Sequence, residues 1–428
     1  METTKRQKFI QLIQQEVVST IGCTEPIAVA LCVAHASEIL PERPLSIHVK
    51  LSANILKNAM GVGIPGTNMI GLPIAIALGA LIGKSTLGLE VLRNCTPEDV
   101  IAGKRMIAEN RICIELENTL EKLYIEVYCK SENYESKAII VGAHTHLVYL
   151  EKNKQILLDE KSRITEKKMD LGLDLNFKDL YEFATTAPLA ELLFILETAQ
   201  VNISAAHEAL HGDYGHSLGK TLHDTSSDHI LGNCTFQRIL SFTSAACDAR
   251  MAGAMIPVMS NSGSGNQGIA ATIPVVIYAH DYHKSEEDLT RALILSHLTV
   301  IYIKESLGRL SALCGCVVAA TGSSCGITYL MGGTYEQITS AVKNMIANLT
   351  GMICDGAKPS CALKVASGVS TAVLSAMMAI QNHTVTALEG IINDDVDKCI
   401  QNLTRIGTEG MIETDRVILD IMTNKSFT

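Results

Sequence analysis

The sequence predicts an α+β fold, with a large all-helical domain and a smaller α/β domain whose sheet is mainly antiparallel. Four short alternating or β-branched runs, separated by polar turns, fill residues 111–151, as neighbouring strands do. From about residue 175 the chain has the pattern of helices rich in alanine and other small residues. We therefore expect an N-terminal helix pair at 1–40, the α/β domain at 41–172 and the helical domain at 173–428.

The N-terminal helix pair is predicted from apolar spacing and from one proline. Apolar residues recur at helical intervals over 5–19. The loop "GCTEP" follows, and its Pro26 suits the first turn of a second helix, with Thr24 as the cap.

The elements after this pair alternate between strand, loop and helix. Residues 44–54 alternate as a strand does, the glycine-rich residues 61–68 indicate a loop, and residues 71–83 predict a short buried helix. The four strands of the 111–151 region follow, and helices take up the rest of the chain.

Charge and composition exclude several classes of partner. The formal charge of −10 argues against binding to a phosphate backbone, which requires clustered lysine and arginine. The first 18 residues are amphipathic and charged, without the apolar core of a secretory signal. The uncharged stretch 310–335 is too rich in small and polar residues for a lipid-facing helix. We expect a cytoplasmic protein that binds neither nucleic acid nor membrane.

The 13 cysteines are therefore not expected to form disulfides. Most are predicted to be small buried apolar residues, as free cysteines usually are. Five of them lie in apolar patterns of this kind: Cys32, Cys113, Cys129, Cys234 and Cys247.

A glycine-rich segment, "SNSGSGNQG" at 260–268, has two functional interpretations. It contains the dinucleotide-binding spacing G-x-G-x-x-G, but no strand precedes it in a βαβ pattern. Free backbone N–H groups at the start of the following helix instead predict a site for a small carboxylate. Asn261, Ser262, Ser264 and Asn266 would add donors. A plain helix connection remains the alternative.

A second glycine-rich segment, at 52–68, joins Lys57 and either Asn54 or Asn58 to a loop. Contact with a substrate and a simple surface loop are both compatible with it.

Two cysteine pairs lie forty residues apart, in "SALCGCVVAATG" and "MICDGAKPSCALKV". Zinc sites favour C-x-x-C knuckles, which neither pair provides. Three thiolates around a [4Fe–4S] cluster would leave one iron open as a Lewis acid. Buried structural cysteines are the alternative.

Four motifs in order, "GCTEP", "SNSGSGNQG", "LSALCG" and "GMICDGAKPSCALK", resemble the L-cysteine desulfidase family, which is related to iron–sulfur L-serine dehydratases. The resemblance implies an oxygen-sensitive [4Fe–4S] cluster with one open iron. It also implies α,β-elimination from L-cysteine to hydrogen sulfide, ammonia and pyruvate. The ligands that it implies are Cys314, Cys354 and Cys361, and Cys316 is the alternative to Cys314 as the first ligand.

The resemblance also implies a catalytic thiol at Cys23. We expect this residue to act as the base, as a thiolate whose pKa the cluster site lowers, with Glu25 as the second candidate. The substrate carboxylate would bind the 260–268 segment and Thr24, with Asn58 nearby. A homodimer remains an option for the assembly.

Three alternatives remain open at this point. An iron–sulfur L-serine dehydratase differs only in the leaving atom. A pyridoxal-phosphate lyase would need a Schiff-base lysine, for which Lys358 is available, and a phosphate cup. A non-enzymatic iron–sulfur sensor would hold iron without turning over an amino acid.

Overall fold

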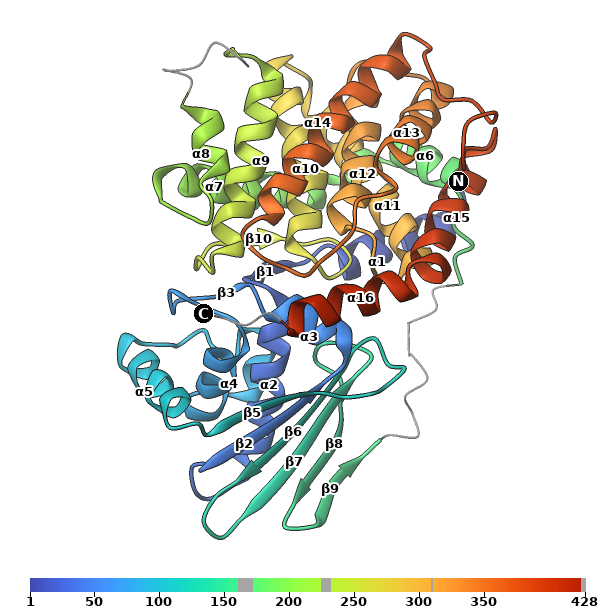
Figure 1. The fold of residues 1–428 in the computed structure, drawn as a ribbon. Coiled ribbons are helices and arrows are strands. Elements are labelled where there is room, and N and C mark those ends of the chain that lie inside the picture. The colour runs from blue at the N-terminus through green and yellow to red at the C-terminus, as the bar shows by residue number, and fades with distance from the viewer. Residues whose placement is uncertain (161–171, 225–231, 309–310, 425–428) are drawn as a thin grey trace.

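The computed structural model describes residues 1–160, 172–224, 232–308 and 311–424. A part built almost wholly of helices lies against a part that contains a six-stranded sheet (Figure 1). This arrangement confirms the predicted α+β class with a large helical part.

The sheet part follows the first helix and strand of the chain. Its elements are α2 (Thr24–Glu38), β2 (Ser46–Leu51), α3 (Ala53–Ala59), β3 (Gly63–Ile64), β4 (Met69–Ile70), α4 (Leu72–Leu81), η1 (Ser85–Glu90), α5 (Pro97–Ala108), β5 (Ile112–Leu116), β6 (Tyr124–Lys130), β7 (Glu135–Val141), β8 (Leu147–Lys152) and β9 (Gln155–Asp159). The sheet order is β5-β2-β6-β7-β8-β9, and α2 and α4 pack on one face of it.

Strand β5 differs from the sequence-based expectation of four consecutive antiparallel strands. It pairs in parallel with β2, which separates it from β6, while the other neighbours in the sheet are antiparallel. The connection through α3, α4 and α5 carries the chain back to the same end of the sheet, as a parallel pair requires. Strand β9 was not predicted.

The segment 52–68 is not a surface loop. Its first half forms α3, where Lys57 is 2% and Asn58 9% exposed. Its second half contributes β3, which pairs with β4 in a small hairpin.

The helical part contains most of the second half of the chain. Its elements are α6 (Phe177–Thr186), η3 (Leu189–Glu191), η4 (Leu193–Ile195), α7 (Leu196–His211), α8 (Leu218–His223), α9 (Thr235–Met251), β10 (Pro257–Met259), α10 (Gly265–Asp281), α11 (Glu286–Leu307), α12 (Gly315–Leu330), α13 (Tyr335–Leu349), α14 (Cys361–Ile380), α15 (Val396–Arg405), η5 (Ile406–Gly410) and α16 (Ile412–Thr423). Helix α12 packs against α10, α11, α13 and α14, and so lies at the centre.

The two N-terminal helices pack into different cores. Helix α1 (Thr3–Glu16) buries Phe9 and Ile13 with the helical part, whereas α2 buries Ile27 and Leu31 against the sheet. Between them, β1 (Ser19–Ile21) pairs antiparallel with β10 of the helical part. The "GCTEP" loop follows β1 directly, so the fold places this loop where the two parts meet.

The C-terminal helix α16 lies along the boundary between the two parts (Figure 1, dark red) and contacts α3. Its Leu419 belongs to the core under the sheet. The chain thus returns to the sheet part after completing the helical part.

Among the described residues, α14 is the helix long and apolar enough to cross a membrane by length and composition. Half of its most apolar window is buried, and it packs against α9, α12 and α13. A core helix has the same properties.

Candidate active site

The two cysteine-bearing loops lie side by side. The N–H of Cys314 donates to the carbonyl of Met352 (3.0 Å), and the N–H of Cys354 donates to the carbonyl of Ala312 (2.7 Å). Cys314 occupies the N-cap position of α12, and Cys361 is the first residue of α14. The residues between the two loops form α12 and α13, an outgoing and a returning helix that bring the chain back to the same place.

Cys314 and Cys316 differ in their tendency to ionise. The Cys316 thiol donates a hydrogen bond to Cys314, which lowers the pKa of Cys314 and raises the pKa of Cys316. The positive charge of Lys364 also lowers the pKa of Cys314. The thiol of Cys314 therefore ionises more readily than that of Cys316, and the thiolate is the form that ligates metals.

The other thiols of this region affect one another. Burial raises the pKa of Cys354 and raises the pKa of Cys361 to about 11, and in both cases the charge of Cys314 adds to the rise. Burial also raises the pKa of Cys247 on α9, followed by the charge of Cys361. These charge effects weaken with distance, so the thiols of this region lie near one another.

This donor set suits an iron–sulfur cluster better than a single ion. Within the described ranges, the thiols of Cys314, Cys354 and Cys361 do not form a group with all ligand atoms inside 4.8 Å. A cluster binds each thiolate through a different iron, so its ligands stand further apart. Cys314 and Cys361 also lie at helix N-termini, whose partial positive charge favours thiolates.

Cys23 and Glu25 form a hydrogen-bonded pair in the "GCTEP" loop. The Cys23 thiol donates to Oε2 of Glu25 (3.0 Å), and Nδ2 of Asn58 donates to Oε1 of the same carboxylate (3.2 Å). Cys23, rather than Thr24, occupies the N-cap position of α2. The Thr24 hydroxyl instead donates to the carbonyl of Gly263 in the glycine-rich segment, at 3.5 Å.

The protein groups around Cys23 do not by themselves lower its pKa, an effect that the sequence-based prediction assigned to the cluster. Burial, followed by the charge of Glu25, raises the pKa of the Cys23 thiol well above its usual value, and Arg250 opposes this rise. The protein groups therefore keep Cys23 protonated and place a proton acceptor, Glu25, against it.

Arg250 is the functional residue that the sequence did not reveal. It lies on α9 and is 3% exposed; one terminal nitrogen (NH1) donates to Oδ1 of Asn266 (3.1 Å). Its buried Nε has no hydrogen-bond partner among the described residues. A Cβ at Gly265 would lie 2.3 Å from this Nε, so only glycine leaves room there. The one available signal was an arginine within the small and apolar residues of 239–251.

The side chains of the glycine-rich segment that were predicted to donate hydrogen bonds to a substrate have different partners in the structure. Asn261 is fully buried, and its amide nitrogen donates to Nδ1 of His297 (3.0 Å) and to the carbonyl of His297 (3.1 Å). The Ser262 hydroxyl donates to Oδ1 of Asn261 (2.8 Å). The amide nitrogen of Asn261 therefore donates to His297 and not to a substrate. Ser264 is the N-cap residue of α10, and Asn266 faces Arg250.

Lys57 connects the sheet part to the cysteine loops. A Cβ at Gly356 would lie 2.2 Å from the carbonyl oxygen of Lys57, and Gly356 has a φ of +90°. Burial raises the pKa of the nearby Cys354 thiol, and the charge of Lys57 opposes this rise. The Lys57 ammonium itself pairs with Asp415 of α16 at 2.5 Å.

Comparison with known proteins agrees with this geometry. The model of the serine dehydratase alpha chain matches residues 86–420. The chain belongs to the serine dehydratase alpha chain family. A UPF0597 protein of Bacteroides fragilis is 66% identical over 426 residues, which cover 99% of this chain and 100% of that protein. A UPF0597 protein of Bacteroides thetaiotaomicron is 64% identical over 99% of both chains, and one of Porphyromonas gingivalis is 50% identical over 99% of this chain and 100% of its own.

Membership of the serine dehydratase alpha chain family implies a lyase with an iron–sulfur cluster. The matched range includes Arg250, the glycine-rich segment and both cysteine loops, whereas Cys23 and Glu25 precede it. Family membership and the local structure both argue against dinucleotide binding at 260–268. The strand before that segment, β10, is three residues long and pairs antiparallel with β1, so no βαβ unit surrounds it.

A cavity of about 260 Å³ opens beside the "GCTEP" loop and the glycine-rich segment. Thr24 and Gly263 line one side of it, and Glu90 and His144 contribute from the sheet part. A small polar molecule can therefore reach the hydrogen bond between the two loops.

Proposed function

We propose that this member of the serine dehydratase alpha chain family is an L-cysteine desulfidase that eliminates sulfide from L-cysteine. The products are hydrogen sulfide, ammonia and pyruvate. The cofactor is a [4Fe–4S] cluster held by Cys314, Cys354 and Cys361, with one iron free of protein ligands. When bound, this cluster supplies a Lewis acid that stabilises the departing sulfur.

The observation that supports the proposal most is the position of Arg250. Its charge acts on the pKa of Cys23 in one loop and on the pKa of Cys247, a thiol outside the predicted ligand set that is itself affected by the charges of Cys361 and Cys314. A buried cation, whose Nε has no hydrogen-bond partner among the described residues, therefore lies near the predicted base and near a thiol that neighbours the predicted ligands. An α-amino acid has the matching groups: a carboxylate, a Cα proton and a leaving atom on Cβ.

Arg250 and Asn266 are the proposed holders of the substrate carboxylate. A guanidinium presents donors in a planar fork that suits a carboxylate. Asn266 fixes the orientation of that fork through its hydrogen bond. The proposed role of Asn261, Ser262 and Ser264 is to hold the backbone of the segment in its conformation. The hydroxyl of Thr24 links the "GCTEP" loop to this segment through its hydrogen bond to Gly263.

Cys23 and Glu25 are the proposed base. As the Cα–H bond breaks, the Cys23 sulfur accepts the proton and passes its own proton to Oε2 of Glu25. The electron pair of the Cα–H bond forms the double bond to Cβ, and the Cβ–S bond breaks to release sulfide. Asn58 holds the carboxylate in place for this transfer. The resulting aminoacrylate tautomerises to an imine, which water hydrolyses to pyruvate and ammonia.

The compartment is part of the proposal. The described part of the chain contains no disulfide, and an oxygen-sensitive cluster requires reducing conditions. Both features fit the cytoplasm.

Anaerobic reconstitution with iron and sulfide, followed by parallel assays on L-cysteine and L-serine, tests this function. We expect about four irons per chain, the number in a [4Fe–4S] centre, and pyruvate with sulfide from L-cysteine. Air should remove the cluster absorption and the activity together. Activity on L-serine alone would make the protein an L-serine dehydratase, which is the second candidate because of the family match.

Two further outcomes would contradict the proposed lyase. Bound iron without turnover of either amino acid would indicate a sensor. Activity that survives air, together with the yellow spectrum of an internal aldimine, would indicate a pyridoxal-phosphate enzyme.

Single substitutions test the ligand set. Cys314→Ala, Cys354→Ala and Cys361→Ala should each lose iron and activity, because a three-thiolate site has no spare ligand. Cys325→Ala is the matched control, since Cys325 is fully buried on α12 but lies outside the group of interacting thiols. Cys316→Ala should keep its iron. If it loses iron while Cys314→Ala retains it, the ligand within this pair is Cys316.

A further inference from the structure

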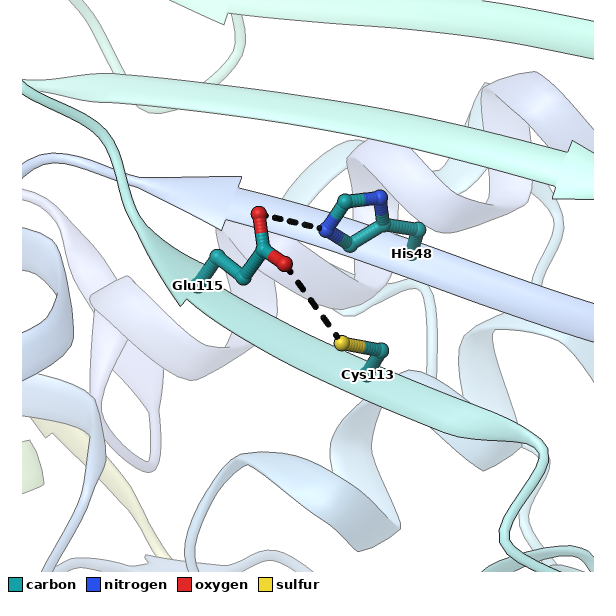
Figure 2. Close-up of side chains that lie close together, drawn as sticks. All are labelled: His48, Cys113 and Glu115. Atoms are coloured by element: carbon teal, nitrogen blue, oxygen red, sulfur yellow. Dashed lines mark hydrogen bonds and ion pairs between the residues drawn. The ribbon is translucent and has the colours of Figure 1, made fainter.

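Three side chains capable of binding a metal converge on the exposed face of the sheet, on strands β2 and β5. His48 of β2 and Cys113 of β5 are directly paired in the parallel register. Glu115 follows Cys113 by two residues, so it points to the same face of β5. Figure 2 shows the Glu115 carboxylate between the imidazole and the thiol.

The spacing of these groups suits a single ion. Nε2 of His48 lies 2.9 Å from Oε2 of Glu115, and the Cys113 sulfur lies 4.0 Å from Oε1. One ligand atom from each residue lies within 4.8 Å of the other two, and within the described ranges this is the group that meets that condition. An ion with bonds of roughly 2.0–2.3 Å can reach three atoms spaced in this way.

A simple imidazole–carboxylate pair does not account for the geometry. Although Nε2 of His48 is only 2.9 Å from Glu115, it is shielded from solvent and the contact does not meet hydrogen-bond geometry. Cys113 was expected to be a buried apolar residue, yet it is exposed on an edge strand. Cys234 is also exposed, at the start of α9, and within the described ranges it belongs to no such group.

We propose that His48, Cys113 and Glu115 bind a divalent transition-metal ion of the Zn²⁺ class. A nitrogen, a sulfur and an oxygen donor select zinc over magnesium or calcium, which prefer oxygen ligands. The thiolate and the carboxylate would neutralise the two positive charges. The fourth position of a tetrahedral ion remains open to water. This site uses none of the residues assigned to the elimination reaction, so it does not depend on the proposed function.

The ion would hold the edge strand β5 to its neighbour β2. Strand β5 ends the sheet order and is held by β2 on one side only. A metal bound by both strands adds a link that exists only in the folded protein, so it stabilises the fold. Strand β2 leads directly into α3, which carries Lys57 and Asn58.

Protection of Cys113 from a thiol reagent tests the site in the anaerobically isolated holoprotein. Zn²⁺ should slow modification of Cys113 at least about tenfold, because a coordinated thiolate is no longer a free nucleophile. Modification of Cys234, followed by peptide mass spectrometry in the same sample, should not change. Because each thiol is read separately, zinc binding at the cluster cysteines does not obscure the result.

Substitutions identify the other ligands. His48→Ala and Glu115→Gln should each remove the protection of Cys113. Glu117→Gln is the matched control, because Glu117 pairs with Lys50 at the end of the same strand and should leave protection intact. With Co²⁺ in place of Zn²⁺, the protein should show a thiolate-to-cobalt band that Cys113→Ser abolishes. Equal protection in wild type and His48→Ala, or none in either, would reduce the group to an ion pair and overturn the site.

Discussion

At the residue scale, the proton between Cys23 and Glu25 decides how the proposed base works. A thiol whose pKa is raised is a poor base by itself, but it can relay a proton when a carboxylate accepts at the same moment. This makes the two residues interdependent.

Cys23→Ser and Glu25→Gln should each keep the cluster absorption and lose turnover by about 10²–10⁴-fold, the usual value of a positioned base. Both should also abolish exchange of the substrate Cα proton with deuterated water. Cys32→Ser, a buried cysteine on the same helix, serves as the control with normal turnover. Near-normal activity in Cys23→Ser would leave Glu25 as the base without a relay. Loss of iron would make Cys23 a ligand.

Arg250 carries the second prediction at this scale. Arg250→Lys keeps the charge but loses the planar fork, so KM for the amino acid should rise by about 10- to 100-fold with iron content unchanged. Arg238→Lys tests the specificity of the effect, because Arg238 lies on the same helix but pairs with Asp281. An unchanged KM in Arg250→Lys would show that the carboxylate binds elsewhere.

Single residues also show what the sequence could predict about the site. The cysteine ligands and Cys23 were predicted because they lie in motifs that resemble a known family. Arg250 lies in no such motif, and its importance comes from Gly265 and Asn266, which approach it only in the folded chain. Asn261 was predicted as a donor to substrate, but a sequence pattern gives no direction for an amide, and His297 holds it.

At the element scale, the close contact between α3 and the second cysteine loop fixes the position of Cys354. Gly356 approaches the backbone of Lys57 in a conformation that other residues adopt only at a cost. The sequence indicated neither the helix α3 nor its contact with the second cysteine loop. A helix of seven residues is too short to show a clear apolar periodicity.

Gly356→Ala should therefore destabilise the protein by at least about 1–2 kcal/mol, the cost of a left-handed conformation, and lower its iron content. Gly351→Ala is the matched control in the same connection, since a Cβ there meets nothing within 4 Å. Thermal unfolding and iron analysis of both variants measure the effect. Equal iron content and equal melting temperatures would mean that the loop adjusts freely.

Strand pairing shows a second limit at this scale. The alternation of β5 was visible in the sequence, but its partner was not, because local patterns do not identify a neighbour that is distant along the chain. The resulting β2–β5 pair created the group of His48, Cys113 and Glu115, which no sequence spacing predicted.

At the scale of the whole molecule, α16 joins the two parts through the ion pair between Lys57 and Asp415. The Lys57 side chain is 2% exposed and that of Asp415 26%, so Asp415 is the counter-ion of a buried ammonium group. The α+β class itself was predictable, because strands and helices occupy separate stretches of the sequence. The contact of α16 with the sheet part could not be predicted from the sequence.

Asp415→Asn should lower the free energy of unfolding by roughly 1.5–3 kcal/mol, the value of a hydrogen bond to a charged group. Glu413→Gln on the same helix should change it by about 0–1 kcal/mol, because its pair with Arg416 is exposed. Chemical denaturation of the two variants makes the comparison. Equal effects would mean that α16 is held by apolar packing and not by this pair.

The wide separation of the site residues along the chain also sets an order of events during biosynthesis. Cys23 is made early, but the last proposed cluster ligand, Cys361, and Asp415, which pairs with Lys57 of α3, are made near the end. At ~5–20 residues/s, roughly 20–70 s pass between the synthesis of Cys23 and that of Cys361. During this interval a nascent chain has no complete place for iron. Iron delivery should therefore follow the synthesis of Cys361, and chains that stop before this residue should accumulate without iron at the cluster site.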